Sequence, residues 1–125
     1  MTFENLEAVY RLIEKVRDLT VALWLDRDSL EVRELRKAEN KLWQLEDELY
    51  DLQRVELGNF LKTVAEGDVK RIIRFRYCRG MSWEDIAERF GCRRENGEKI
   101  AKKLIDYLSV TQISGDGDEI SREKG

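Results

Sequence analysis

The chain has 125 residues, of which 42% are hydrophobic and 39% are charged, and its formal net charge is −3. This length allows one or two small helical cores but not an elaborate enzyme. No segment approaches the roughly 18 apolar residues of a membrane span, and the N-terminus lacks the basic region and cleavage site of a signal peptide. We therefore expect a cytoplasmic protein without a membrane partner.

The residues that catalysis or metal binding would need are scarce. The chain has no His, and its two cysteines, Cys78 and Cys92, lack the close spacing of zinc ligands. There is also no Gly-rich phosphate loop and no nucleophile motif. We expect no enzymatic activity, no cofactor, no metal and no disulfide.

The first half of the chain predicts two long helices. No Gly or Pro occurs before Gly58, so the strongest helix breakers are absent from this region. A first helix is expected from about Phe3 to Leu25, because apolar residues recur there at alternating steps of three and four. Asp28 with Glu31 forms an approximate capping box, which predicts that a second helix starts there and ends near Leu57.

The second helix carries a heptad pattern in Leu35, Ala38, Leu42, Leu45, Leu49 and Leu52. Residues 1–57 are therefore expected to fold as an antiparallel coiled-coil hairpin. Trp43 and Tyr50 widen its apolar face beyond what a two-helix contact needs, so the extra surface either covers the rest of the chain or self-associates. We expect a homodimer or higher homo-oligomer. The candidate interface residues are Leu35, Leu42, Trp43, Leu45, Leu49, Tyr50 and Leu52.

The second half of the chain predicts a linker, a unit of short helices and a tail. Residues 58–67, bracketed by two glycines, are expected to form a short helix or hinge, and residues 111–125 a flexible tail. Within residues 68–110, Asp68 is expected to cap a helix that ends before Gly80. Ser82 with Asp85 then opens the next helix.

Two further helices are expected in this unit, and each has one apolar face. The first face contains Trp83, Ile86, Ala87 and Phe90, and the second contains Ile100, Ala101, Leu104, Tyr107 and Leu108. Two short helices joined by the turn around Gly91 have the pattern of a helix-turn-helix.

The segment from Arg74 to Cys92, RFRYCRGMSWEDIAERFGC, resembles region 4 of sigma-70-type factors. In that family a helix ending R-Y-x-x-G is followed by [LM]-S-x-x-E-I-A-x-x-[LF]-G. The segment is also similar to phage late-gene regulators of the ArpU and RinA type. The resemblance implies an all-α protein in which a sigma region 4-like helix-turn-helix follows the hairpin. It further implies a phage or prophage transcription regulator whose partners are double-stranded DNA and RNA polymerase.

In a helix-turn-helix the second helix lies in the major groove, here the helix near residues 94–108. Arg, Asn and Glu match the edges of guanine, adenine and cytosine. The candidate base-reading residues are Arg93, Arg94, Glu95, Asn96, Lys99, Lys102 and Lys103. If Asn96 is the cap, the helix starts later and Glu98, Lys99, Lys102 and Lys103 face the groove. The candidate phosphate contacts are Lys70, Arg71, Arg74 and Ser82.

Positive charge is concentrated in the same region. Residues 67–106 have a net charge of +4, whereas residues 1–66 have −5. This distribution is typical of a phosphate-contacting surface. Alternatively, the cations Lys70, Arg71, Arg74 and Arg79 pair with hairpin acids such as Glu46, Asp47 and Glu48.

Three functions are compatible with these patterns. The first is a sequence-specific DNA-binding regulator, whose dimer would read half-sites one helical turn or a multiple apart. The second is an adaptor that contacts RNA polymerase or another regulator. The third is a DNA-packaging subunit similar to the small terminases.

Overall fold

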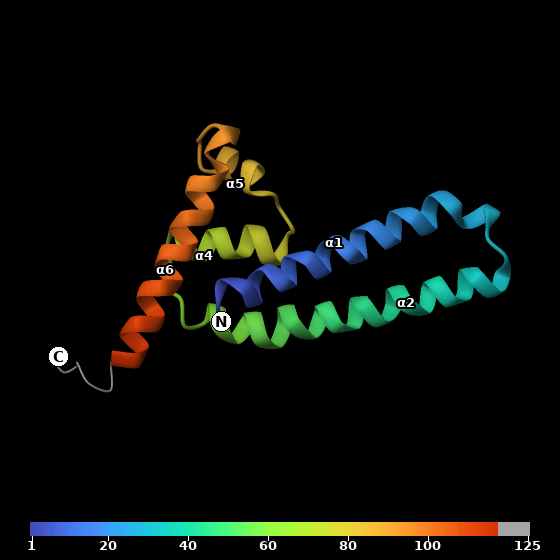
Figure 1. The fold of residues 1–125 in the computed structure, drawn as a ribbon, viewed down its shortest axis with the longest axis horizontal. Helices are drawn as coiled ribbons and strands as arrows, with labels where there is room; N and C mark the ends of the chain where they lie inside the picture. Colours follow the sequence, from blue (N-terminus) through green and yellow to red (C-terminus); the bar gives the residue numbers. More distant parts are fainter. Residues whose placement is uncertain (118–125) are drawn as a thin grey trace.

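The computed structural model describes residues 1–117, with side chains through Val110, and every element in this part of the chain is helical (Figure 1). Two long N-terminal helices pack side by side as a hairpin. A group of helices from residues 68–117, here called the C-terminal body, packs against the open end of the hairpin. The predictions of an all-α chain and of two paired N-terminal helices are confirmed.

Helix α1 spans Phe3–Asp26, close to its predicted bounds. Its start is fixed by a reciprocal cap. The backbone N–H of Asn5 donates to the Thr2 hydroxyl at 3.0 Å, and the backbone N–H of Thr2 donates to the Asn5 side-chain oxygen at 3.2 Å. These bonds satisfy two of the backbone donors that have no partner within the helix.

Helix α2 spans Val32–Asp51. The predicted capping pair, Asp28 with Glu31, is wrong, because Arg27–Ser29 forms a 3-10 turn after α1. The capping box is instead made by Glu31 and Glu34. The helix can begin only after Leu30, whose backbone is extended.

Helical structure continues beyond α2 without a break. A π-helical segment, Leu52–Leu57, leads directly into α3, Gly58–Leu61. Gly58 itself has a helical φ of −58°, so the segment predicted as a short helix or hinge begins as a short helix. The chain turns only within residues 62–67.

The C-terminal body begins with α4, Asp68–Ile73, which continues as a π-helical turn, Arg74–Cys78. The N-cap residue of α4 is Gly67, so the prediction that Asp68 is the cap is wrong by one position. Residues 79–82 then connect the π-helical turn to the next helix.

Helix α5 spans Trp83–Arg89. The predicted cap is confirmed, since the backbone N–H of Asp85 donates to the Ser82 hydroxyl at 3.1 Å. A 3-10 turn, Arg94–Asn96, precedes α6, Gly97–Gly117. Helix α6 thus extends past residue 110, where the tail was predicted to begin, and residues 118–125 of that tail lie outside the described residues.

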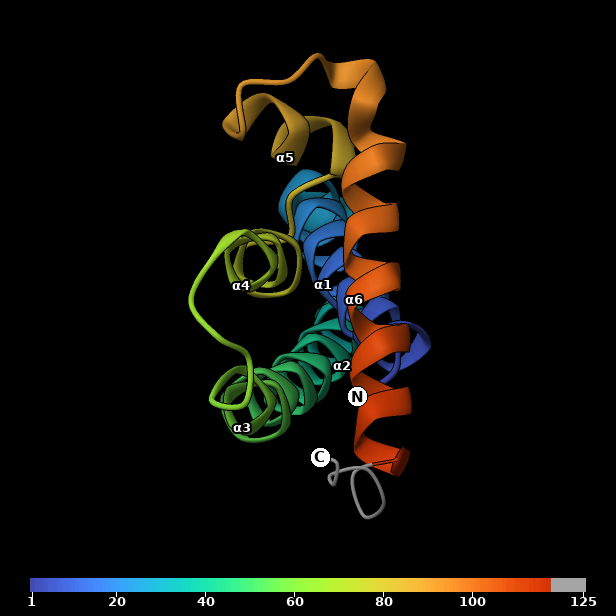
Figure 2. The same ribbon diagram turned by 90° about the vertical axis from the view of Figure 1, so that its left-hand side faces the viewer.

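Helix α6 lies across the open end of the hairpin, and α4 lies beside α1 (Figures 1 and 2). The core forms where these elements meet. Its fully buried side chains include Leu6, Val9, Leu57, Ile72, Ile73, Tyr77, Ile86 and Leu104. The predicted apolar faces of α5 and α6 are confirmed by the burial of Ile86, Ala87, Ile100, Leu104 and Leu108.

Helix α2 contributes no buried residue. Its heptad residues Leu35, Leu42, Leu45, Leu49 and Leu52 are half-buried, whereas Trp43 and Tyr50 are exposed. The hairpin extends well beyond the C-terminal body (Figure 1). Over that distance each of its two helices is therefore covered on one side only.

Arg76 is buried at the junction of hairpin and body, with 6% of its surface exposed. Its guanidinium donates two hydrogen bonds to the Glu7 carboxylate, at 2.9 and 3.2 Å, and a third to the carbonyl of Met81 at 3.2 Å. The same group lies 3.4 Å from the centre of the Tyr10 ring and 4.3 Å from that of Trp83. A buried charge is tolerated when it is paired and hydrogen-bonded in this way.

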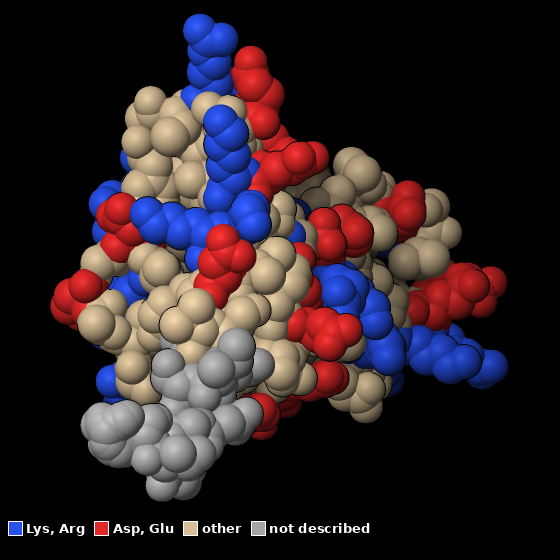
Figure 3. All heavy atoms as spheres, turned by 60° about the vertical axis from the view of Figure 1, so that its left-hand side comes forward, with Lys and Arg blue, Asp and Glu red and all other residues tan. Residues whose placement is uncertain are grey.

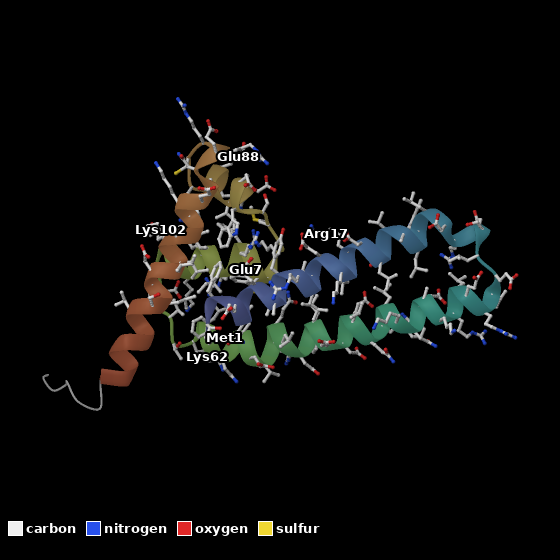
Figure 4. The ribbon with its side chains drawn as sticks, in the orientation of Figure 1. Met1, Glu7, Arg17, Lys62, Glu88 and Lys102 are labelled. Carbon is white, nitrogen blue, oxygen red and sulfur yellow. The ribbon has the colours of Figure 1, made fainter. Side chains whose placement is uncertain are left out.

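Three further bonds join the hairpin to the body. The Tyr77 hydroxyl donates to Glu7 at 2.5 Å, Arg17 donates to the Gly80 carbonyl at 3.0 Å, and Gln53 donates to the Tyr77 carbonyl at 2.9 Å. Burial and the bond to Glu7 raise the pKa of Tyr77, so its hydroxyl remains a donor at neutral pH. Figure 4 shows Glu7 and Arg17 on the side of α1 that faces the body.

Gly80 lies against α1 at this junction. Its φ of 68° is in the left-handed region, and an added Cβ would lie 2.7 Å from side-chain atoms of both Ile13 and Arg17. Only glycine meets both demands without strain. The turn between α4 and α5 is thereby held directly against α1.

We expect Glu7→Gln to destabilise the protein by about 2–4 kcal/mol, because it leaves the buried guanidinium of Arg76 without its counter-charge. The free energy of unfolding is measured by urea titration with circular dichroism. Glu14→Gln, an exposed change of the same kind on α1, should shift it by less than about 0.5 kcal/mol. Equal effects of the two substitutions would contradict the role given to Glu7.

Candidate functional site

The turn between α5 and α6 determines where the first residues of α6 lie. Gly91 follows α5 with a φ of 77°, and the Cys92 N–H donates to the Ala87 carbonyl at 2.9 Å. The Asn96 N–H then donates to the Arg93 carbonyl at 2.9 Å within the 3-10 turn. Helix α6 begins at the next residue, so the later of the two predicted starts is the one observed.

Gly97 brings the first turn of α6 against the first turn of α5. An added Cβ would lie 3.0 Å from the Glu84 nitrogen and from the Trp83 carbonyl carbon, and 3.1 Å from the Trp83 Cβ. Contacts this short require atoms to shift, and two of these three atoms belong to the backbone. By helix propensity alone, a glycine within a helix costs about 1 kcal/mol relative to alanine. The close approach of α5 and α6 explains why a glycine occupies this position.

The candidate base-reading residues lie around this turn and along the outer side of α6. Asn96 is half-buried, and the others, Arg93, Arg94, Glu95, Lys99, Lys102 and Lys103, are exposed. Figure 3 shows Lys and Arg side chains projecting at the end of the molecule that carries the α5–α6 turn, with acidic side chains beside them. Lys102 lies on the side of α6 that faces away from the hairpin (Figure 4). These side chains therefore share a surface far from the hairpin tip.

Three of these cations are held in ion pairs. Arg94 contacts Asp85 at 2.6 Å and Glu88 at 2.7 Å, while Lys102 lies 3.6 Å from Asp106. Lys103 lies 3.4 Å from Asp68 at the start of α4.

The other two cations of this group, Arg93 and Lys99, form no ion pair within the part of the chain that the structure describes. Their charge is therefore the least compensated on this surface. It is fully available to an external anion.

The candidate phosphate contacts are arranged differently from the prediction. Lys70 pairs with Glu66 at 3.0 Å, Arg71 lies 3.8 Å from Asp68, and the Ser82 hydroxyl is occupied as the cap of α5. Only Arg74 is exposed with no ion pair among the described residues. The alternative that Lys70 and Arg71 pair with hairpin acids is wrong, since their partners belong to their own segment.

Three arginines converge on Phe75, and one of them, Arg89, was not predicted as a contact from the sequence. The guanidinium carbons of Arg71, Arg79 and Arg89 lie 5.9, 5.4 and 5.2 Å from the centre of the Phe75 ring. We call these three arginines the arginine cluster. Arg71 also lies 4.7 Å from the centre of the Phe90 ring, so the cluster adjoins the α5–α6 turn through Phe90.

A sequence signal for part of the cluster existed. Arg71, Phe75 and Arg79 follow one another at steps of four, which places them on one side of a helix. Arg89 comes from α5, where the pattern indicated only a solvated face. Its place in the cluster depends on how α5 packs against the turn after α4, which periodicity does not report.

The hollow beside the first turns of α6 is smaller than a usual small-molecule site. The described residues contain no group of three His, Cys, Asp or Glu side chains placed to hold a metal ion. A hollow between α4 and α6, lined in part by Phe90, Ile100 and Lys103, has a volume of about 200 Å³. Small-molecule pockets usually measure about 300–1,000 Å³. In the described helices, none combines the length and apolar character that crossing a membrane requires.

No protein family matches the chain, and no curated protein or solved structure is significantly similar to it.

We expect Gly97→Ala to destabilise the protein by about 1–2 kcal/mol, since the clash with α5 exceeds the gain in helix propensity. Gly58→Ala is the matched control: the nearest atom to its added Cβ is the Gln53 oxygen at an ordinary 3.6 Å. This control should stabilise the protein by up to about 1 kcal/mol. Chemical denaturation measures both, and a stabilising Gly97→Ala would refute the close approach.

The hydrogen bond from Arg94, with a second from Ser82, holds the pKa of Asp85 below its ordinary value. The interaction therefore stabilises the fold at neutral pH and is lost as the pH falls through the lowered pKa. We expect Arg94→Gln to raise the Asp85 pKa, as followed by carbon NMR of the carboxyl group. Arg93→Gln, which alters a neighbouring unpaired cation, should leave that pKa nearly unchanged. Equal shifts in both variants would exclude a specific pair.

Proposed function

We propose that the protein binds double-stranded DNA, with α5, the following turn and α6 acting as a helix-turn-helix. The observation that carries this proposal is the pair of uncompensated cations, Arg93 and Lys99, which flank the start of a helix whose outer side faces away from the hairpin. In such motifs the N-terminal residues of the second helix meet base edges in the major groove.

The shape of this end of the molecule supports the proposal. A helix with its side chains is about 10–12 Å wide, and the major groove of B-form DNA is about 12 Å wide. The hairpin extends away from α6, so it does not obstruct a duplex that approaches the outer side of this helix (Figure 1). Lys99, Lys102 and Lys103 would then enter the groove from one helix face.

The arginine cluster is suited to contact phosphates. Three guanidiniums that surround one aromatic ring repel one another, and an anion relieves this repulsion. Arg79 and Arg89 form no ion pair among the described residues, and Arg71 has only Asp68 at 3.8 Å. Phosphate contacts position a protein on the duplex and give binding its dependence on salt. We assign the cluster this positioning role beside the base-reading helix.

Arg94 is expected to contribute less than its neighbours. It already donates to Asp85 and Glu88, so a base or phosphate must displace these carboxylates. Such exposed ion pairs are weak, typically under about 1 kcal/mol. Arg94 can therefore be released, but its net gain from DNA is smaller than that of an unpaired cation.

The resemblance of Arg74 to Cys92 to sigma region 4 supports a narrower role as a phage or prophage transcription regulator. The same surface would serve an adaptor if an acidic protein such as a polymerase subunit took the place of DNA. A packaging subunit similar to small terminases would need a ring of many copies. No catalytic step, cofactor or metal enters this proposal.

We expect the purified protein to bind duplex fragments, with affinity that falls steeply as salt rises. Lys99→Glu should weaken binding at least about tenfold, because it removes one phosphate-facing or base-facing charge and adds a repulsive one. Lys15→Glu makes the same change on the exposed side of α1 and should have little effect. Binding is measured by fluorescence anisotropy at several salt concentrations.

Two results would oppose the assignment. Absence of binding to any duplex at low salt would exclude DNA and leave the adaptor, which salt-independent binding to a protein partner would then support. An equal loss in Lys99→Glu and Lys15→Glu would mean that overall charge, and not the outer side of α6, determines binding.

A further inference from the structure

One face of α1 is covered over only half of its length. At the open end of the hairpin, which we call its root, this face carries Leu6, Tyr10, Ile13 and Arg17. All four lie against the C-terminal body, through the core, the Arg76 guanidinium and Gly80. The body therefore packs on this particular side of the hairpin.

The same face continues to the tip without a cover. Steps of three and four from Arg17 lead to Val21 and Trp24, which places them on the side that the body covers at the root. Val21 and Trp24 are 50% and 79% exposed. On α2, Trp43 is 60% exposed and lines one groove with Trp24, Leu23 and Leu42. Trp24 also lines an adjoining hollow with Val21 and Leu25. We call Val21, Trp24, Leu25 and Trp43 the distal apolar face.

The distal apolar face is large enough to form the centre of a protein interface. Aromatic side chains present about 150–250 Å² each, so the exposed parts of Trp24 and Trp43 alone amount to roughly 200–350 Å². With Val21 and Leu25, the face reaches the size of the largest apolar patches on ordinary monomers, about 300–600 Å². A standard protein interface buries about 800 Å² on each partner. The distal apolar face can supply the apolar centre of such an interface.

We propose that a second copy of this chain covers the distal apolar face, with the two hairpins antiparallel. The direction follows from the shape of the molecule. The C-terminal body stands on the root of the same face, so two hairpins that met with their roots together would bring their bodies into collision. With roots at opposite ends, each tip lies in the space that the other hairpin leaves free.

In this arrangement, the basic half of α2 in one copy lies near the acidic half of α2 in the other copy. Its first half carries Arg33, Arg36, Lys37 and Lys41 against two acids, and its second half carries Glu46, Asp47, Glu48 and Asp51 without a cation. All eight of these side chains are exposed. Antiparallel approach of two α2 helices brings opposite charges together, whereas parallel approach brings like charges together.

Other occupants fit this face less well. Residues 17–47 carry six Lys or Arg and eight Asp or Glu, so a polyanion has no net attraction to the tip. The chain's own C-terminal body is held at the root by the bonds of Glu7, Arg17 and Gln53. A second copy needs no further component, and it does not depend on DNA binding.

Sedimentation equilibrium of the whole chain tests the proposal. We expect a mass of two chains at about 100 μM, well within the range of moderate affinities. Trp24→Glu should give the mass of one chain with an unchanged helical signal, because this side chain makes little contact within its own chain. Val55→Glu places the same charge at a residue that is 53% exposed near the root, outside the groove, and should remain a dimer. A wild-type mass of one chain, or equal dissociation of both variants, would overturn the proposal.

Cross-linking tests the direction. Ser29→Cys is placed at the hairpin tip in a chain whose exposed Cys78 and Cys92 are replaced by Ser. Antiparallel hairpins keep the two tips apart, so a short bis-maleimide should leave the dimer without a cross-link. Efficient cross-linking of Ser29→Cys would overturn the antiparallel arrangement.

Discussion

The buried guanidinium of Arg76 determines how the two parts of this molecule meet. It binds the Glu7 carboxylate on α1, stacks between Tyr10 and Trp83, and donates to the Met81 carbonyl. Trp83 in turn begins α5, and the first turn of α6 rests on its backbone at Gly97. A chain of contacts thus runs from the hairpin to the residues proposed to read DNA. The direction in which α6 presents its cations therefore depends on an ion pair remote from them.

Local signals in the sequence predicted most of the elements but few of the contacts between them. The Ser82 cap, the apolar faces of α5 and α6, and the bounds of α1 all follow from residues within about one helical turn of each other. The pair Glu7–Arg76 joins residues 69 positions apart, and in the sequence Arg76 is one of four arginines between positions 71 and 79. Periodicity shows which side of a helix is apolar. It does not show which helix will cover that side.

The same limit applies to the candidate site. The cations of the turn and of α6 were predicted from the helix-turn-helix pattern to face a groove, and all of them are exposed. The spacing of these cations along the sequence does not show which acidic side chains they pair with. Arg94 is bound by Asp85, nine residues earlier, so one of the two arginines suited to guanine is also the most compensated cation of the group. The arginine cluster depends in the same way on the packing of α5 against the turn after α4.

Helix α6 and the hairpin tip lie at opposite ends of the molecule's long axis (Figure 1). If two copies pair through their distal apolar faces with the hairpins antiparallel, their α6 helices face outward at opposite ends of the dimer. Two such helices cannot occupy neighbouring half-sites on one straight duplex, as the sequence-based picture of a dimeric regulator assumed. The assembly would instead act as a bridge between two separate duplexes, or between distant sites on one duplex that loops back. The unusual length of the hairpin would then set the distance at which the two DNA segments are held.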